Sequence, residues 1–190
     1  MNNSFANSIE RVINYTAAEK RERLALGLPV AEQSPAGILL RKHAGSRPIP
    51  KQILTAPQVL NEAPAYGSAF CRGMRFELPN GLVQLLVSGT AAVSETGATL
   101  YPGDFRAQCW RTYRNITALL ENGGASWQDI VRTTCYLRDI ERDYDQFNSI
   151  RNEFYGALGL DPVPPSTGIQ ARLCRSDLLV EIEAIAMYVR

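Results

Sequence analysis

The stretch VEIEAIA, Val180 to Ala186, decides the fold and lies almost at the end of the chain. Its apolar and β-branched residues predict a buried β-strand. It nevertheless carries two glutamates, Glu181 and Glu183, on the same side of that strand. A buried carboxylate without a partner costs free energy or gives up its charge. These glutamates therefore face solvent, have partners, or take part in chemistry.

Further back in the chain, the sequence predicts a β-hairpin. Two apolar runs, 74–78 and 82–89, flank Pro79-Asn80-Gly81, and Asn-Gly between apolar runs is a strong hairpin signal. Within the second run the odd-numbered positions Val83, Leu85 and Val87 are all apolar. We expect that strand to turn one fully apolar face to the core.

Two helices and three further strands follow. Asp104 is a good N-cap for a helix that ends at Gly123 and Gly124. A second helical stripe runs through 144–158 and ends at Gly159. The first stripe comprises Phe105, Cys109, Thr112, Ile116, Leu119 and Leu120, and the second Phe147, Ile150, Phe154 and Leu158. Strands are predicted at 130–139, with Val131, Thr133, Cys135 and Leu137 on one side, and at 167–174 and 178–189.

The order of these elements predicts an α+β domain with a single mixed sheet and both helices on one face. The other face of such a sheet has no cover. We therefore expect the chain to associate with copies of itself.

The first part of the chain has a different character. Residues Ser8 to Leu26 favour a charged helix, and a stretch rich in Gly and Pro follows it. We interpret residues 1–60 as an N-terminal extension, a helix plus an irregular arm, and residues 61–190 as the domain. The extension could serve as a lid, a brace across an assembly, or a packing arm.

Composition excludes several classes of protein. Lys plus Arg is 20 and Asp plus Glu is 19, giving a net charge of +1, so we expect no nucleic-acid partner. No apolar run approaches the about 20 residues that span a membrane. The chain has one histidine, His43, and four cysteines without a C-x-x-C pair, which argues against a metal site. We expect a cytoplasmic protein with reduced thiols and no cofactor.

Several motifs together resemble the RidA/YjgF family. They are LVSGT, PGD, AQCWRTYRNITALLENGG, DIVRTTCYLRDI, FNSIRNEF and VEIEAIA, in the family's order and spacing over residues 63–190. The resemblance implies a chorismate-mutase-like fold, a homotrimer with a central barrel, and small-molecule pockets in the clefts between subunits. Its best-known members hydrolyse reactive enamines and imines, with a glutamate of the last strand positioning the attacking water. That glutamate matches Glu181, while Glu183 is expected to pair with a basic group.

The resemblance also suggests substrate-binding residues. Asn148 matches an asparagine of the second helix, Tyr66 a tyrosine of a loop over the pocket, and Ser88 a pocket serine just after its strand. Each of these polar residues is equally compatible with a purely structural role.

One important family residue is missing. The arginine that clamps the substrate carboxylate is replaced by Pro165, followed by Ser166 and Thr167. Hydroxyl and backbone N–H groups of Ser166 and Thr167 could still hold an anion or a carbonyl. Arg72 and Arg75 are alternative cations, or else residues of an exposed strand edge.

A second resemblance concerns Cys174, which lies seven residues before Glu181. Chorismatases, which share the fold, place a cysteine at a comparable distance from their catalytic glutamate. A one-residue slip in the loop would turn Cys174 to the other face, where it would be a buried structural cysteine. Three hypotheses stay open: hydrolysis of an imine, enamine or enol ether by Glu181, chorismatase-like release of pyruvate, and ligand binding without catalysis.

Overall fold

The computed structural model describes residues 15–26 and 49–190, with the exception of the side chain of Tyr66. The chain divides into two compact units, Met1–Pro48 and Ile49–Arg190. In the first unit, helix α1 (Ala17–Ala25) begins at Thr16, whose hydroxyl accepts a hydrogen bond from the Glu19 amide while the Glu19 carboxylate accepts one from the Thr16 amide. This reciprocal capping box explains the start of the helix. The other parts of the predicted extension that precede Ile49, residues 1–14 and 27–48, lie outside the described residues.

The second unit begins at Ile49, which is earlier than the predicted boundary at residue 61. Strand β1 (Lys51–Ile53) pairs with the next strand of the sheet. Leu54 and Leu60 are fully buried in the core. Residues 49–60 therefore belong to the domain and not to the extension.

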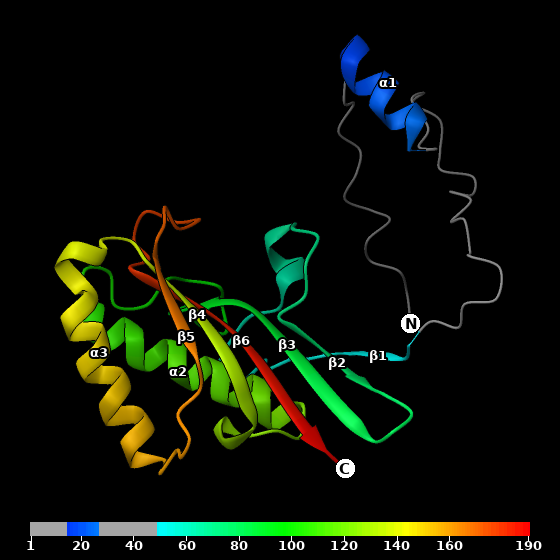
Figure 1. The fold of residues 1–190 in the computed structure, drawn as a ribbon. Helices are drawn as coiled ribbons and strands as arrows, with labels where there is room; N and C mark the ends of the chain where they lie inside the picture. The colour runs from blue at the N-terminus through cyan, green and yellow to red at the C-terminus, as the bar shows by residue number, and fades with distance from the viewer. Residues whose placement is uncertain (1–14, 27–48) are drawn as a thin grey trace. The chain divides into compact units, whose positions relative to one another are not determined.

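The domain contains one mixed six-stranded sheet in the order β1-β2-β3-β6-β4-β5. Its further strands are β2 (Gly73–Glu77), β3 (Leu82–Ala91), β4 (Ile130–Leu137), β5 (Ser166–Gln170) and β6 (Val180–Val189). β6, red in Figure 1, runs between β3 and β4 and is antiparallel to both, whereas β5 is parallel to β4. The strand that contains VEIEAIA thus occupies the interior of the sheet.

The predicted hairpin is confirmed. β2 and β3 pair antiparallel around Pro79-Asn80-Gly81. The Asn80 side chain accepts a hydrogen bond from the Leu82 amide at 3.1 Å, and Gly81 adopts φ 81°. This left-handed conformation favours glycine.

Both predicted helices are present. Helix α2 (Phe105–Asn122) begins at Asp104, whose carboxylate accepts a hydrogen bond from the Ala107 amide at 3.0 Å. Helix α3 comprises Ile140–Ala157, whereas the sequence pattern predicted a start at Tyr144. The helix begins earlier because the Asp139 carboxylate caps it by accepting a hydrogen bond from the Arg142 amide. Two short 3-10 helices, η2 (Ala63–Tyr66) and η3 (Trp127–Asp129), complete the described elements.

The helices cover one face of the sheet, and strand alternation fixes which residues they bury. In β6, Ile182, Ala184 and Ala186 are each at most 2% exposed. In β4 the predicted alternation fails at Val131, which is 40% exposed, because the register shifts between Ile130 and Arg132. Such a bulge places two residues opposite one and re-aims the side chain. We call the face of the sheet that α2 and α3 do not cover the helix-free face.

Gln108 of α2 connects the helix to the last strand. Its side chain is fully buried. The amide nitrogen donates to the carbonyl oxygens of Tyr101 and Asp177 at 3.1 and 2.8 Å, and the amide oxygen accepts from the Leu179 amide at 2.8 Å. One side chain thus satisfies three backbone groups and fixes the entry to β6.

We predict that Gln108→Leu lowers the free energy of unfolding by about 2 kcal/mol or more, because buried backbone groups lose their partners. Urea unfolding followed by circular dichroism measures this change. Gln128→Leu is the matched control: Gln128 is exposed and its side-chain amide donates to the Leu158 carbonyl, so the change should stay within about 0.5 kcal/mol. Equal effects of the two substitutions would contradict the role of Gln108.

Candidate active site

Glu181 lines a cavity of about 370 Å³ beside the end of β3. In β6 it is the neighbour of the core residue Ile182, so alternation directs its side chain to the helix-free face. The side chain is partly buried. The other residues that line the cavity fall into two groups. The polar ones are Ser68, Arg72, Ser88, Cys174 and Arg175, and the apolar ones are Phe70, Gly89, Ala91, Val93 and Leu178.

The carboxyl group of Glu181 packs directly on Gly89. A Cβ atom at Gly89 would lie 2.0 Å from Glu181 Oε1, so any other residue there would displace the carboxyl group. The β3–β6 register shifts between Val87 and Thr90, at this same point. The irregular strand and the missing side chain together provide the space for the Glu181 carboxyl.

The surroundings of Glu181 raise its pKa. Burial is the largest cause, and the negative charge of Glu183 adds to it, while the positive charge of Arg72 acts in the opposite direction. The carboxyl can therefore hold a proton at a higher pH than an exposed glutamate does. This property suits a group that both gives and takes protons.

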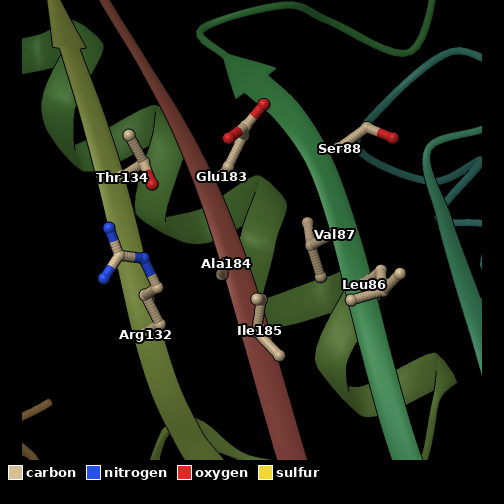
Figure 2. A pocket seen from close by; sticks show the side chains of 8 residues that line it. All are labelled: Leu86, Val87, Ser88, Arg132, Thr134, Glu183, Ala184 and Ile185. Carbon is tan, nitrogen blue, oxygen red and sulfur yellow. The ribbon is translucent and has the colours of Figure 1, made fainter. Parts of the chain in front are cut away.

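Glu183 has a different environment, although it lies on the same face. It is exposed and accepts a hydrogen bond from the Tyr136 hydroxyl at 2.9 Å. The expectation that Glu183 pairs with a basic group is wrong. Among the described residues, no arginine or lysine forms an ion pair with Glu183. Figure 2 shows Glu183 projecting from β6 between Arg132 and Thr134 of β4 and residues of β3. These residues line a neighbouring cavity, which shares Ser88 with the Glu181 cavity.

Arg72 is a buried cation in the wall of the Glu181 cavity and not part of an exposed strand edge. Its side chain is 5% exposed and donates from Nε to the Asn61 carbonyl and from Nη2 to Asn61 Oδ1, both at 2.8 Å. Its guanidinium lies 5.2 Å from the centre of the Phe70 ring. Arg75, the other candidate, pairs with Glu77 at 3.1 Å and does not line this cavity.

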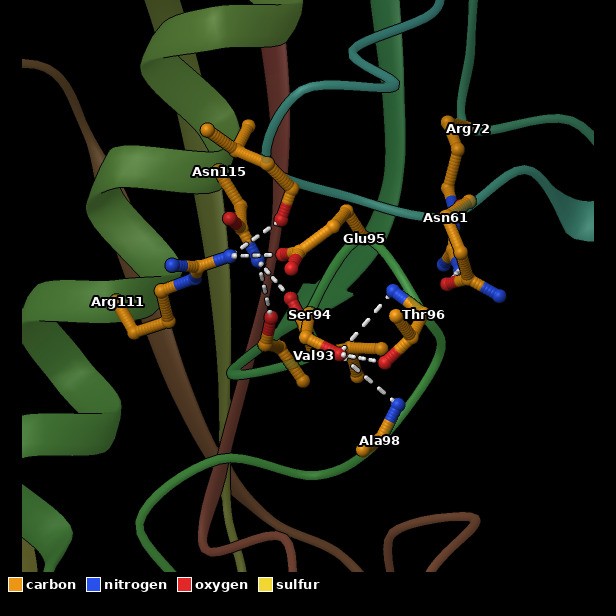
Figure 3. Close-up of polar contacts among 11 residues, drawn as sticks. Asn61, Arg72, Val93, Ser94, Glu95, Thr96, Ala98, Arg111 and Asn115 are labelled. Carbon is orange, nitrogen blue, oxygen red and sulfur yellow. Dashed lines mark hydrogen bonds and ion pairs between the residues drawn. The ribbon is translucent and has the colours of Figure 1, made fainter.

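Polar side chains hold the turn that follows β3. Asn115 of α2 donates to the carbonyl oxygens of Ala91 and Val93 at 3.0 and 2.9 Å. Ser94 Oγ accepts from the amides of Thr96 and Ala98. Figure 3 shows this cluster and the nearby Asn61–Arg72 contact. Because Ala91 and Val93 line the Glu181 cavity, these bonds fix one of its walls.

Cys174 lies in the same cavity as Glu181. Its side chain is exposed and the thiol is free, so the alternative of a buried structural cysteine is wrong. The next residue, Arg175, donates to the Gly97 carbonyl at 2.7 Å and to the Thr99 hydroxyl at 3.2 Å. The Arg138 guanidinium holds the loop from the other side by donating to the carbonyl oxygens of Leu178 and Arg175.

Two other predicted residues belong to the strand and loop around the cavity. Ser88 lies within β3, not after it, and its hydroxyl donates to the Cys71 carbonyl at 2.7 Å. Tyr66 ends η2, and its side chain is outside the description. The aromatic ring that lines the cavity from this loop is Phe70, which was not predicted from the sequence. The sequence signal for Phe70 is its position two residues before Arg72, because residues two apart in an extended chain lie on the same side.

The remaining predicted residues lie elsewhere in the protomer. Ser166 points to the helix side of β5, with its hydroxyl 3.6 Å from Cys135 Sγ. Asn148 on α3 accepts a hydrogen bond from Arg151, and Thr167 accepts one from Arg132 at 3.1 Å. None of these three lines the Glu181 cavity.

Two general expectations concern metals and membranes. Within residues 15–26 and 49–190, no group of three or more His, Cys, Asp or Glu side chains could hold a metal ion; His43 lies outside these ranges. In the same part of the chain, no helix is both long and apolar enough to cross a bilayer.

Comparison with known proteins identifies the family. The family model described as endoribonuclease L-PSP matches residues 64–188. A RutC family protein of Pyrococcus abyssi is 31% identical over 102 residues, which are 54% of this chain and 76% of the relative. A RutC family protein of Pyrococcus horikoshii is 29% identical over 102 residues, 54% of this chain and 77% of the relative.

Solved structures share the fold. The YjgF gene product of E. coli superimposes with a TM-score of 0.59 at 24% identity, covering 73% of this chain and 98% of that one. The E. coli protein TdcF, solved with bound serine, has a TM-score of 0.59 at 22% identity and the same coverage. The predicted α+β fold, with a mixed sheet and two helices on one face, is thereby confirmed. The chain belongs to the endoribonuclease L-PSP family, which is the RidA/YjgF family that its motifs resemble.

Proposed function

We propose that the protein is an enzyme that adds water to an imine, enamine or enol-ether group of a small metabolite, with Glu181 as the acid/base. The observation that carries the proposal is the partly buried Glu181 carboxyl, whose pKa is raised inside a cavity of about 370 Å³. A cavity of this size suits a metabolite rather than a polymer. The serine bound to TdcF supports a small polar ligand.

The proposed chemistry is a proton relay through one carboxyl group. For an imine, protonated Glu181 gives its proton to the nitrogen, and the resulting carboxylate removes a proton from the attacking water. The C–O bond forms as the C=N π bond breaks, and collapse of the adduct releases ammonia and leaves a carbonyl. For an enamine or enol ether, the first proton goes to carbon. Each half of the relay needs a carboxyl with a pKa nearer neutrality than usual.

The assembly that we propose is a homotrimer formed through the helix-free face. Leu86 and Ile169 are 39% and 41% exposed there, and such apolar side chains gain free energy when a partner covers them. In a cleft between subunits, Tyr66, Asn148, Ser166 and Thr167 would contact the ligand from a neighbouring chain. Light scattering on the full chain measures this assembly.

A second candidate function, chorismatase-like hydrolysis, is favoured by the position of Cys174. The thiol and the Glu181 carboxyl line one cavity, as the resemblance to chorismatases requires. Arg72 and Arg175 add positive charge to the same wall, which suits a carboxylate-bearing substrate. The ribonuclease description of the family has less support, because the net charge is only +1.

We predict that Glu181→Gln lowers turnover by about 100-fold or more, since general acid–base catalysis contributes factors of this size. The assay follows ammonia release from 2-imino acids generated in place by an amino-acid oxidase. Gly89→Ala keeps the carboxyl but displaces it, so it should lose most turnover as well. Full activity of Glu181→Gln on a substrate that the wild type converts would refute the role of Glu181.

The raised pKa of Glu181 also predicts a pH dependence of stability. Above pH 4.5, the unfolded chain releases the Glu181 proton while the folded chain retains it up to the raised pKa. The free energy of unfolding therefore falls as pH rises through this window. Glu181→Gln should lack this fall and gain stability relative to wild type between pH 4 and pH 7. Urea unfolding of both proteins at pH 4 and pH 7 measures the difference in their free energies of unfolding. If this difference were the same at the two pH values, the predicted pH dependence would be contradicted.

The chorismatase-like candidate predicts that the wild type releases pyruvate from chorismate. Lactate dehydrogenase coupled to NADH oxidation detects the pyruvate. Cys174→Ala should change the ratio of the ring products, because the thiol faces the same cavity, while Glu181→Gln should stop pyruvate release. Absence of pyruvate with active wild-type protein would remove this candidate and leave the imine hydrolase standing.

A further inference from the structure

A second cavity, of about 420 Å³, lies between α3 and the chain that enters β5. It shares no lining residue with the Glu181 cavity. Its walls include Tyr144, Arg151 and Tyr155 from α3 and Val163, Pro164 and Ser166 from the other side. Arg151 is the one charged side chain among the described residues that line it.

The guanidinium of Arg151 is held in place by neutral groups. Nη2 donates to Asn148 Oδ1 at 2.6 Å and Nη1 donates to Ser166 Oγ at 3.2 Å. The group also lies 5.4 Å from the centre of the Phe147 ring. Among residues 15–26 and 49–190, no carboxylate oxygen forms an ion pair with it within 4.0 Å.

A guanidinium carries five N–H donors in a planar fork and stays charged in proteins. The two hydrogen bonds of Arg151 leave donors for a ligand, and three side chains already restrict its position. A cation fixed in advance loses less conformational entropy when it binds an anion. Its charge also reaches across the cavity: burial raises the pKa of Tyr155 to about 12, and the positive charge of Arg151 acts against that rise.

We propose that this cavity binds the carboxylate of a small molecule with an apolar or aromatic body, and that Arg151 forms the ion pair. The planar fork matches a carboxylate, and a single positive charge suits a monoanion better than a phosphate dianion. Tyr144, Val163 and Pro164 offer apolar surface for the rest of the molecule. Pro165 leaves the start of β5 without a charged side chain, so α3 supplies the positive charge at this end of the strand.

Two glycines define the shape of the cavity. A Cβ atom at Gly168 would lie 3.3 Å from the Tyr144 ring, so the glycine allows the ring to lie close against β5. A Cβ atom at Gly156 would meet nothing within 4 Å. A larger side chain at Gly156 can therefore be accommodated by the fold and would occupy space in the cavity, which gives a steric variant for the test.

The experiment measures equilibrium binding of benzoate to the full chain by titration calorimetry. Arg151→Gln should raise the dissociation constant at least about tenfold, as expected for loss of a charge-assisted hydrogen-bonded pair. Arg114→Gln removes the same charge from an exposed site on α2 and should leave the constant unchanged. Benzamide, the neutral analogue, should bind at least tenfold more weakly than benzoate, and inorganic phosphate should not compete.

A steric variant tests the location independently of charge. Gly156→Leu keeps Arg151 and should weaken benzoate binding by a similar factor. Equal affinity of wild type and Arg151→Gln, equal affinity for benzoate and benzamide, competition by phosphate, or no saturable binding of benzoate would each overturn the proposal. Asn148 and Ser166, which hold Arg151, are also ligand contacts in the proposed function, so this inference rests in part on that function. Because the measurement requires no turnover, its result can be told apart from a failure of Glu181 as the acid/base.

Discussion

The pairing of β6 on both of its edges is the constraint on which the rest of the structure depends. β3 and β4 lie on either side of it, so the backbone of the strand is hydrogen-bonded in both directions. A shift of one residue would exchange the two faces of the strand. Ile182 and Ala184 would then leave the core, and Glu181 would enter it. The register of β6 therefore determines both the packing of α2 and α3 on the sheet and the exposure of the Glu181 carboxyl to its cavity.

That register places two carboxylates on one face, and their depth separates their properties. Glu181 packs on Gly89 at an irregular part of β3, where burial disfavours its charge. Glu183 is exposed and bonded to the Tyr136 hydroxyl. The charge of Glu183 nevertheless raises the pKa of its neighbour. An exposed carboxylate thus assists in tuning a partly buried one, as paired carboxyl groups do in many sites.

Local chemistry made the central elements predictable, whereas features that depend on distant contacts were not. Asn80-Gly81, the Asp104 cap and the alternation of β6 each act over a few residues, and the sequence patterns identified them. β1 has three exposed residues and no periodicity, so only its pairing with β2 reveals it. The orientation of Cys174 depends on a loop held from elsewhere, and Arg151 follows the pattern of an ordinary surface arginine. Glu181 could be named, but the residues around it could be named only in part.

The loop before β6 is held largely through its backbone, and the Arg175 and Asp177 side chains add hydrogen bonds to Gly97 and Thr99. Arg138 binds the carbonyl oxygens of Leu178 and Arg175, and Gln108 binds that of Asp177 and the amide of Leu179. Backbone groups are the same for nearly every amino acid, so this anchoring tolerates replacement of the side chains that it supports. Natural selection can therefore vary position 174, which borders the cavity, without rebuilding the scaffold. The fold separates what must be kept from what is open to adaptation.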